Sequence, residues 1–287
     1  MNRPFIAIAY NPKSGSYRRD RLERLAAAYN AAGYDAHLID SYAPDFTDRV
    51  LGAAQLCVSG GDGTLRDVIA RIQDAEIIPP VTMFPGGTIN LVAREAGYPP
   101  DIDAFVTRTT GRDAGQMRRH FHAFAGRAAM LVCLSAGPDS MAVDIVSENL
   151  KRRIGRFAYA AAFARLLLRW PRHAMQVRTD TGEYPCEAAF VLKGRYFAGS
   201  WMIDRTADMT QRHFNLLLLP TARRRDYLRL IVAVAVHPVF ASRKWLRLQS
   251  CTATITGPES IPVQVDGDIA CYLPVDVRIS DKSIDFI

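Results

Sequence analysis

The sequence of 287 residues lacks an uninterrupted hydrophobic run of the roughly 20 residues that a membrane-crossing helix needs. Its longest apolar stretch, residues 228–241, is interrupted by His237 and Pro238. Before Asn11 the N-terminus has only a short apolar run and no small-residue cleavage site, so it predicts a first strand and not a secretory leader. We therefore expect a cytoplasmic protein without a transmembrane helix.

Cysteine is also scarce, and no pair has the CxxC spacing. The five cysteines are an odd number, are widely spaced and fall mostly in strand-like apolar runs. This pattern is typical of free thiols in a reducing compartment and argues against a disulfide framework.

Lysine contributes only five of the 36 basic residues, and the net charge is +7. The basic residues gather in clusters, which suit an anionic partner such as a membrane surface, or are solvated helix faces without a partner. No nucleic-acid module accompanies them, so we expect no nucleic-acid partner. The clusters are residues 151–156, then Arg165, Arg169 and Arg172, then residues 223–225, and residues 243–247.

In the first hundred residues, strand-like and helix-like periods alternate. Apolar runs at residues 5–10, 36–39, 55–58 and 81–84 predict strands, and between them residues 20–32 and 65–72 have helical spacing. A short helix through Ala93 follows the fourth strand. This alternation predicts a Rossmann-like α/β domain, residues 1–119, with a parallel sheet covered on both faces.

Beyond residue 100 the pattern changes to strands joined by turns. Together with helices expected at 153–169 and 226–236, these strands predict a second, mainly β domain, residues 120–287. The second helix is either part of the core or the wall of a pocket for an apolar chain. His120 and His122 alternate on a strand without further metal ligands nearby, so we interpret them as structural. The expected strands are 121–134, 187–192, 213–219, 252–255, 262–265 and 275–279.

Three of the parallel strands end in loops of related composition. "NPKSGS" follows the first strand, "GGDGT" the third and "PGGTIN" the fourth. The carboxyl ends of parallel strands share one edge of the sheet, so the three loops should converge there. Glycine lets a ligand approach the backbone closely, and successive N–H groups at a helix N-terminus bind anions. The loops therefore predict a site for a phosphate chain.

The familiar phosphate-binding motifs are absent, however. There is no GxxxxGK[ST], and Arg66 stands where a GxGxxG fingerprint needs its last glycine. Asp62, inside the second loop, would repel a bare phosphate unless it binds Mg²⁺ or accepts a proton. Its presence favours phosphoryl transfer over cofactor binding alone.

At this point the sequence resembles the diacylglycerol kinase catalytic-domain family, which includes sphingosine and ceramide kinases. The matching segments are "NPKSG" at 11–15, "GGDGT" at 60–64, "PGGTIN" at 85–90 and "QVDGD" at 264–268, and residues 151–167 look like the helix after the domain junction. NAD kinases and phosphofructokinases carry loops like the second, but the ordered set of four is specific. The resemblance covers nearly the whole chain.

The resemblance implies an N-terminal nucleotide domain followed along the chain by a C-terminal β-sandwich. It also implies a cleft in which ATP with Mg²⁺ phosphorylates a lipid hydroxyl. The acceptor would be diacylglycerol, ceramide or a sphingoid base, reached by peripheral association with the inner face of the cytoplasmic membrane. Asp62 and Asp268 would be catalytic, with Asp62 also a metal ligand. The nucleotide-binding residues would be Asn11, Ser14, Gly15, Gly60, Gly61, Gly63, Thr64, Gly86, Gly87, Thr88 and Asn90.

Some positions depart from the family pattern. Asp268 stands where glutamate usually acts as the base, and Arg66 replaces a common asparagine. Gln211-Arg212 replaces an Asp-Gly turn that in some bacterial members helps to bind a structural Mg²⁺, which argues against that metal site here. Two alternatives stay open: a soluble-metabolite kinase of the NAD kinase type, and a non-catalytic sensor of nucleotide or lipid.

Overall fold

The computed structural model describes residues 3–111, 117–145, 165–236 and 241–287. It divides into two compact units, one of residues 1–121 with 282–287 and one of residues 122–281. The expected boundary at residue 120 lies beside this division, while the last six residues belong to the first unit. Nearly all of the helix expected at 153–169, and the basic cluster at 151–156, lie outside the described residues.

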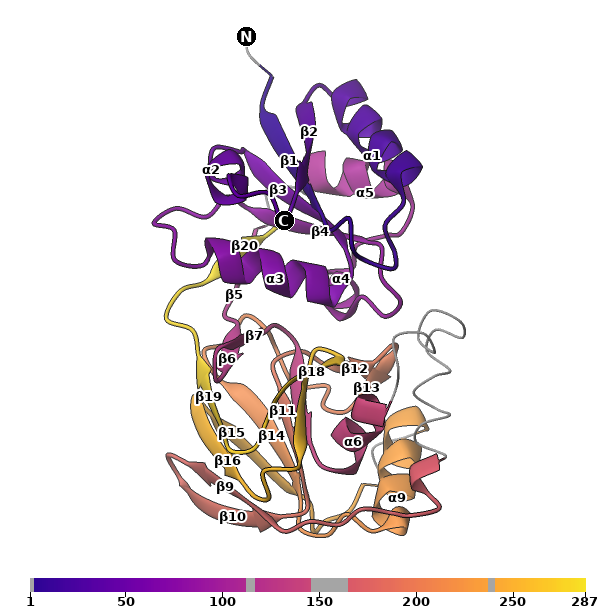
Figure 1. The fold of residues 1–287 in the computed structure, drawn as a ribbon, viewed down its shortest axis with the longest axis vertical. Helices are drawn as coiled ribbons and strands as arrows, with labels where there is room; N and C mark the ends of the chain where they lie inside the picture. Colours follow the sequence, from indigo (N-terminus) through magenta and orange to yellow (C-terminus); the bar gives the residue numbers. More distant parts are fainter. Residues whose placement is uncertain (1–2, 112–116, 146–164, 237–240) are drawn as a thin grey trace. The chain divides into compact units, whose positions relative to one another are not determined.

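The first unit is built on a six-stranded sheet in the order β2-β1-β3-β4-β20-β5 (Figure 1). The pairs β1–β2, β1–β3, β3–β4 and β4–β20 are parallel, and β5 runs antiparallel to β20. The parallel sheet expected from the alternating pattern is confirmed. The strands are β1 (Phe5–Tyr10), β2 (Asp35–Asp40), β3 (Gln55–Gly60), β4 (Val81–Pro85), β5 (Arg118–His120) and β20 (Ile284–Phe286).

Helices cover both faces of this sheet because each has an apolar stripe to bury. In α1, Leu22, Leu25 and Tyr29 are buried, and in α3 the buried residues Leu65 and Val68 lie on one stripe. The pattern did not predict α2 and α5, and it placed the start of α3 three residues too late. The helices are α1 (Arg19–Ala31), α2 (Phe46–Leu51), α3 (Asp62–Ile72), α4 (Leu91–Ala96) and α5 (Ile102–Thr110).

The chain returns to the first sheet at its last residues. Strand β20 lies between β4 and β5, where Ile284 and Phe286 are buried. The Phe286 ring lies against the His120 ring, with centroids 4.7 Å apart. The sequence analysis missed this strand, since three residues are too short for a recognisable period.

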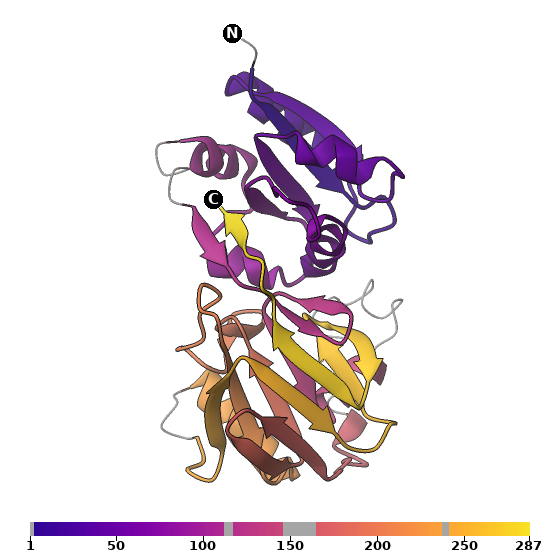
Figure 2. The same ribbon diagram turned by 90° about the vertical axis from the view of Figure 1, so that its left-hand side faces the viewer.

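The second unit is a β-sandwich, as the resemblance implied (Figure 2). Two six-stranded sheets, in the orders β10-β9-β16-β19-β6-β7 and β15-β14-β11-β8-β17-β18, contribute the apolar side chains of one shared core. The first sheet contains β6 (Ala123–Ala125), β7 (Ala128–Met130), β9 (Met175–Thr179), β10 (Gly182–Cys186), β16 (Thr252–Thr256) and β19 (Val275–Ile279). The second contains β8 (Cys133–Ala136), β11 (Ala188–Leu192), β14 (Phe214–Leu219), β15 (Leu246–Ser250), β17 (Pro262–Val265) and β18 (Asp268–Tyr272).

The single strand expected at 121–134 is wrong. The chain there forms β6 and β7 as a hairpin and then enters the other sheet as β8. Gly126 makes the hairpin turn with a φ of 58°, a conformation that favours glycine. The unit also contains a short hairpin of β12 (Tyr196–Ala198) and β13 (Trp201–Met202), and the helices α6 (Pro138–Ile145) and α9 (Arg224–Ala235).

Within the described part of the chain, no helix combines the length and the apolar character that crossing a bilayer requires. All five cysteines are free thiols. Burial raises the pKa of the Cys57 and Cys186 thiols to about 12, so both stay protonated at neutral pH.

Candidate nucleotide site and active-site residues

The order of the parallel strands defines where a ligand can bind to the first unit. From β1 the chain crosses to β2 on one side, and from β3 it crosses to β4 on the other. The carboxyl ends of β1 and β3 therefore flank a topological switch point, where open α/β sheets bind their ligands. Tyr10, the last residue of β1, pairs with Ser59 of β3 at this point.

The loop after β1 is closed by its own polar groups. The Asn11 carbonyl accepts a hydrogen bond from the Ser14 N–H at 3.1 Å, and the Asn11 side-chain Oδ1 accepts one from the Lys13 N–H at 2.8 Å. The Ser14 and Ser16 hydroxyls lie 2.8 Å apart. Asn11 therefore shapes the loop through its side chain.

The glycines of the second and third loops are required by contact between the loops themselves. The Gly86 N–H donates to the Gly60 carbonyl at 2.8 Å. A methyl group on Gly87 would lie only 2.6 Å from the Cα of Gly61, and one on Gly60 would lie 2.7 Å from the Thr64 hydroxyl oxygen. Glycine at position 87 lets the two loop backbones pack directly on each other, and glycine at position 60 leaves room for the Thr64 side chain of its own loop.

Asn90 holds the third loop in shape. It adopts the left-handed conformation, with a φ of 55°, which asparagine tolerates better than most residues. Its side-chain Oδ1 accepts the Gly87 N–H and its Nδ2 donates to the Gly87 carbonyl, both at 2.8 Å. Thr88, between them, is exposed.

Asp62 is buried, with 7% of its surface exposed, and connects the second loop to the third. Its Oδ2 accepts the Leu91 N–H at 2.9 Å and its Oδ1 accepts the Val92 N–H at 3.0 Å. The carboxylate thus satisfies two of the free N–H groups at the start of α4.

A small cavity opens at the switch point, and all three loops contribute to it. Of the predicted nucleotide-binding residues, Asn11, Ser14, Gly60 and Gly86 line it. The others are not among its lining residues: exposed Gly15 of the first loop, and Gly61, Gly63, Thr64, Gly87, Thr88 and Asn90 of the second and third loops.

The cavity has a basic side that the sequence analysis missed. Arg18 and Arg21 line it together with Tyr17, whose ring stacks on that of Tyr10 with centroids 5.7 Å apart. The Arg21 guanidinium lies 4.5 Å from the centre of the Phe84 ring and donates to the Pro100 carbonyl at 3.1 Å. Burial lowers the pKa of Arg21, which nevertheless stays charged at neutral pH. Its position in the first turn of α1, close after the first loop, was the signal that could have identified it.

The two aspartates of the "DGD" segment in the second unit have different environments. Asp266 and Gly267, with φ values of 50° and 97°, form the two-residue turn between β17 and β18. The buried Asp266 carboxylate accepts the N–H groups of Leu131, Val132 and Cys133 at 2.8 to 2.9 Å. Asp268, the first residue of β18, is only half-buried. Asp266 therefore has the structural role, and Asp268 is the more accessible carboxylate.

A buried lysine binds the backbone of the segment that contains Gln211 and Arg212. Lys193, fully buried, donates from Nζ to the carbonyls of Gln211 and His213 at 2.6 and 2.8 Å. Burial lowers the pKa of its ammonium to about 8. Among the residues that the structure describes, no group of three or more His, Cys, Asp or Glu side chains could hold a metal ion.

The fold and this site define a class of protein: a two-unit protein with glycine-rich loops at the switch point of its α/β unit. Residues 6–118 match the family model of the diacylglycerol kinase catalytic domain. This segment therefore resembles a diacylglycerol kinase catalytic domain, and bacterial proteins similar to nearly the whole chain are named as a putative lipid kinase and as diacylglycerol kinases.

Three relatives illustrate the similarity. A diacylglycerol kinase of Staphylococcus epidermidis is 25% identical over 97% of this chain and 90% of its own length. The crystal structure of a diacylglycerol kinase from Bacillus anthracis has the same fold, with a TM-score of 0.78 at 17% identity over 99% of this chain and 96% of the other. An ATP-bound NAD kinase of Archaeoglobus fulgidus is less similar in fold, with a TM-score of 0.56 at 12% identity over 98% and 92% of the two chains.

Proposed function

We propose that this protein transfers the γ-phosphate of ATP to a hydroxyl group of a membrane lipid: diacylglycerol, ceramide or a sphingoid base. The observation that carries the proposal is the cavity at the switch point, where Asn11, Ser14, Gly60 and Gly86 meet. These residues come from the three loops of the family motif, and all lie within the segment that matches the family model.

In this proposal the loops hold the triphosphate. The Gly60–Gly61 and Gly86–Gly87 backbones present no side chains, and the N-terminus of α3 begins at Asp62, directly after the second loop. Helix N-termini attract phosphate through their free N–H groups. Arg18 and Arg21 add positive charge at the same cavity. Phosphoryl transfer depends on this kind of positioning and charge stabilisation.

The residues present fit a Mg²⁺ ion that is bound largely by the nucleotide. Magnesium in kinases is commonly held by one or two carboxylates together with substrate phosphates. Asp62 is the carboxylate among the residues of the three loops, so it would hold the ion. When bound, Mg²⁺ supplies neutralisation of the phosphate charge.

Asp268 is proposed as the acceptor of the lipid hydroxyl proton. Its carboxylate is one methylene group shorter than the glutamate usual in the family, and its place at the start of β18 leaves it half-buried. A general base contributes roughly 10²- to 10⁴-fold to such a reaction. Asp266, two residues earlier, is occupied by three backbone N–H groups and so is not a candidate.

The proposed acceptor lipids lie in a membrane, so the enzyme would work at its surface. The excess of basic over acidic residues, 36 against 29, favours an anionic surface. Peripheral association with the inner face of the cytoplasmic membrane is part of this proposal.

The test is transfer of labelled phosphate from ATP with Mg²⁺ into mixed micelles of diacylglycerol, ceramide or sphingosine, with NAD as a soluble acceptor. We expect label in one of the lipids, a large loss in Asp268→Asn, and normal rates in Glu259→Gln, an exposed acidic residue of the same unit. Label in NAD alone would support the NAD kinase alternative, which is favoured by the shared fold. ATP binding without transfer to any acceptor would support a sensor.

A further inference from the structure

Helix α9 presents an outward face with several exposed side chains. Tyr227, Leu230 and Ala233 are buried against the domain. On the other side, Leu228 is 53%, Val232 is 40% and Val236, the C-terminal cap, is 67% exposed. Residues four apart lie above one another on a helix, so these three aliphatic side chains form one row along the solvent side.

The N-terminal half of the same face is basic. Arg224, Arg225 and Arg229 are all exposed there. The Arg224 side chain donates to the Leu168 carbonyl at 3.3 Å, which brings Leu168, 80% exposed, to the edge of the surface. We define the α9 face as Leu168, Arg225, Leu228, Arg229, Val232 and Val236.

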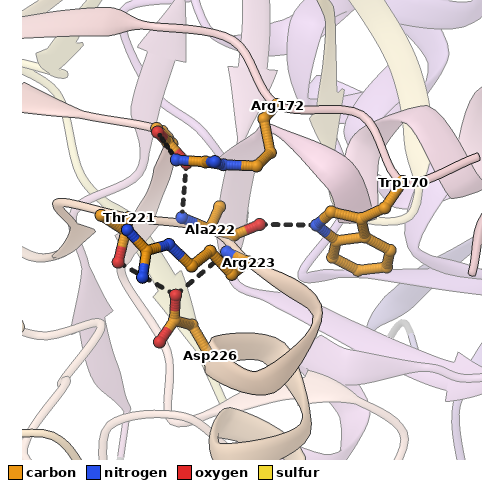
Figure 3. A network of polar contacts seen from close by, with 7 residues as sticks. Trp170, Arg172, Thr221, Ala222, Arg223 and Asp226 are labelled. Carbon is orange, nitrogen blue, oxygen red and sulfur yellow. Dashed lines mark hydrogen bonds and ion pairs between the residues drawn. The ribbon is translucent and has the colours of Figure 1, made fainter.

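A polar network fixes the first turn of α9 (Figure 3). Trp170 donates from Nε1 to the Ala222 carbonyl at 2.6 Å, and the Ala222 N–H donates to Glu187, which is ion-paired with Arg172. Asp226 accepts the Thr221 hydroxyl at 2.9 Å and the Arg223 N–H at 3.0 Å. The outward row is therefore carried on a helix that is anchored to the sandwich.

In this network Asp226, the only acidic residue of α9, is bound at the start of the helix and is not part of the outward face. The Asp226 carboxylate is occupied at the helix start, and the Trp170 ring packs on Tyr227 with centroids 5.2 Å apart. Among the residues that make up the α9 face, charge is of one sign only. The face thus combines exposed aliphatic side chains with arginines.

We propose that the α9 face docks on an anionic phospholipid bilayer. Arginines attract anionic headgroups, and an amphipathic helix lying in the interface places its aliphatic row at the boundary of headgroup and acyl chain. An acidic bilayer suits this arrangement better than a second copy of the chain, because two basic faces repel each other. The inference rests on the proposed function only in assuming that the substrate lies in a membrane.

The test is sedimentation of the full chain with vesicles, without nucleotide. We expect binding to vesicles of roughly three parts phosphatidylcholine to one part phosphatidylglycerol, and little to phosphatidylcholine alone. Arg225→Gln combined with Arg229→Gln should weaken binding about tenfold or more and flatten its salt dependence. Leu228→Glu combined with Val232→Glu should abolish it. Ile77→Glu, at an exposed aliphatic position in the other unit, is the control.

A second readout separates this inference from the kinase assignment. With a short-chain diacylglycerol dissolved as monomers, the variants of the α9 face should keep the wild-type transfer rate, while transfer to the same lipid in vesicles falls. Vesicle binding that is unchanged in both variants would overturn the inference, whatever the kinase assay shows. The inference would also be overturned if the wild-type protein were a dimer and the Leu228→Glu/Val232→Glu variant a monomer, because the face would then join two copies of the chain. Vesicle binding without transfer to any acceptor would leave the docking face standing and the proposed function refuted.

Discussion

The Asp62 carboxylate accepts the backbone N–H of Leu91 at 2.9 Å, although 29 residues separate the two in sequence. With the parallel contact to Val92, this bond caps α4 from the first residue of α3. Through these bonds, the acidic residue of the second loop also holds two loops of the proposed nucleotide site together. A loss of activity after its replacement has two sources, and they can be separated.

We expect Asp62→Asn to lower both stability and turnover. An amide keeps one acceptor oxygen but turns an NH₂ group toward a backbone N–H, so one buried donor is left unsatisfied at about 1–3 kcal/mol. Urea unfolding measures this loss. A variant with wild-type stability and a large loss of kcat would contradict the structural role and leave only a chemical one.

Asp266→Asn and Asp268→Asn should behave in opposite ways. Asparagine tolerates the left-handed conformation of residue 266, but it cannot accept the three N–H groups from residues 131–133 as a carboxylate does. We expect it to lose about 1–3 kcal/mol of stability. Asp268→Asn should leave the unfolding midpoint unchanged and lower kcat by roughly 10²- to 10⁴-fold. Equal stability losses in the two variants would contradict this division of roles.

Gly87→Ala should disrupt the site without altering any charge. The added methyl group would lie 2.6 Å from the Gly61 Cα and 2.8 Å from the Asn90 Oδ1, so the two loops must move apart. We expect a cost of about 1–3 kcal/mol and weaker ATP binding by calorimetry. Gly52→Ala is the matched control, because nothing lies within 4 Å of its new methyl group and its φ is −83°. A tolerated Gly87→Ala would refute the close packing of the loops.

Arg21→Met should weaken ATP binding specifically. Methionine retains an apolar stem to pack on Phe84 but removes the guanidinium at the cavity. A charge-assisted hydrogen bond to phosphate is worth about 1.5–3 kcal/mol, so KM for ATP should rise roughly 10- to 100-fold while kcat changes little. Arg24→Met, an exposed arginine of the same helix, is the control. An unchanged KM would remove Arg21 from the nucleotide site.

His122 should make the protein sensitive to acid. Burial, with a smaller effect of the nearby Lys193 charge, lowers the pKa of His122 to about 4 from 6.5, and neither ring nitrogen has a hydrogen-bond partner. The unfolded chain then binds the proton more tightly, so stability is complete above pH 6.5 and falls as the pH drops toward 4. Protonation of His122 should lower the free energy of unfolding by an amount on the order of 3 kcal/mol. His122→Phe should flatten this part of the stability curve, and an unchanged slope would contradict the assignment.

The sequence by itself determined the order of elements and the place of the loops. Alternating apolar periods at residues 5–10, 55–58 and 81–84 predict parallel strands, and parallel strands must bring their carboxyl ends to one edge. That geometric rule needs no tertiary contact, and the cavity lined by Asn11, Gly60 and Gly86 follows from it. The prediction that the second domain is a β-sandwich came from the resemblance to the lipid kinase family.

Only the tertiary structure decided what the individual side chains do. Asp62 and Leu91, Asp266 and Val132, and Gly61 and Gly87 are far apart in sequence, and no periodicity encodes which of them meet. The return of β20 to the first sheet and the exposed row on α9 depend likewise on which neighbours pack against each element. Hydrophobic patterning reports which residues are buried along a strand or helix, because it reflects local burial alone. Hydrogen-bond partners and uncovered faces are set by contacts between distant segments.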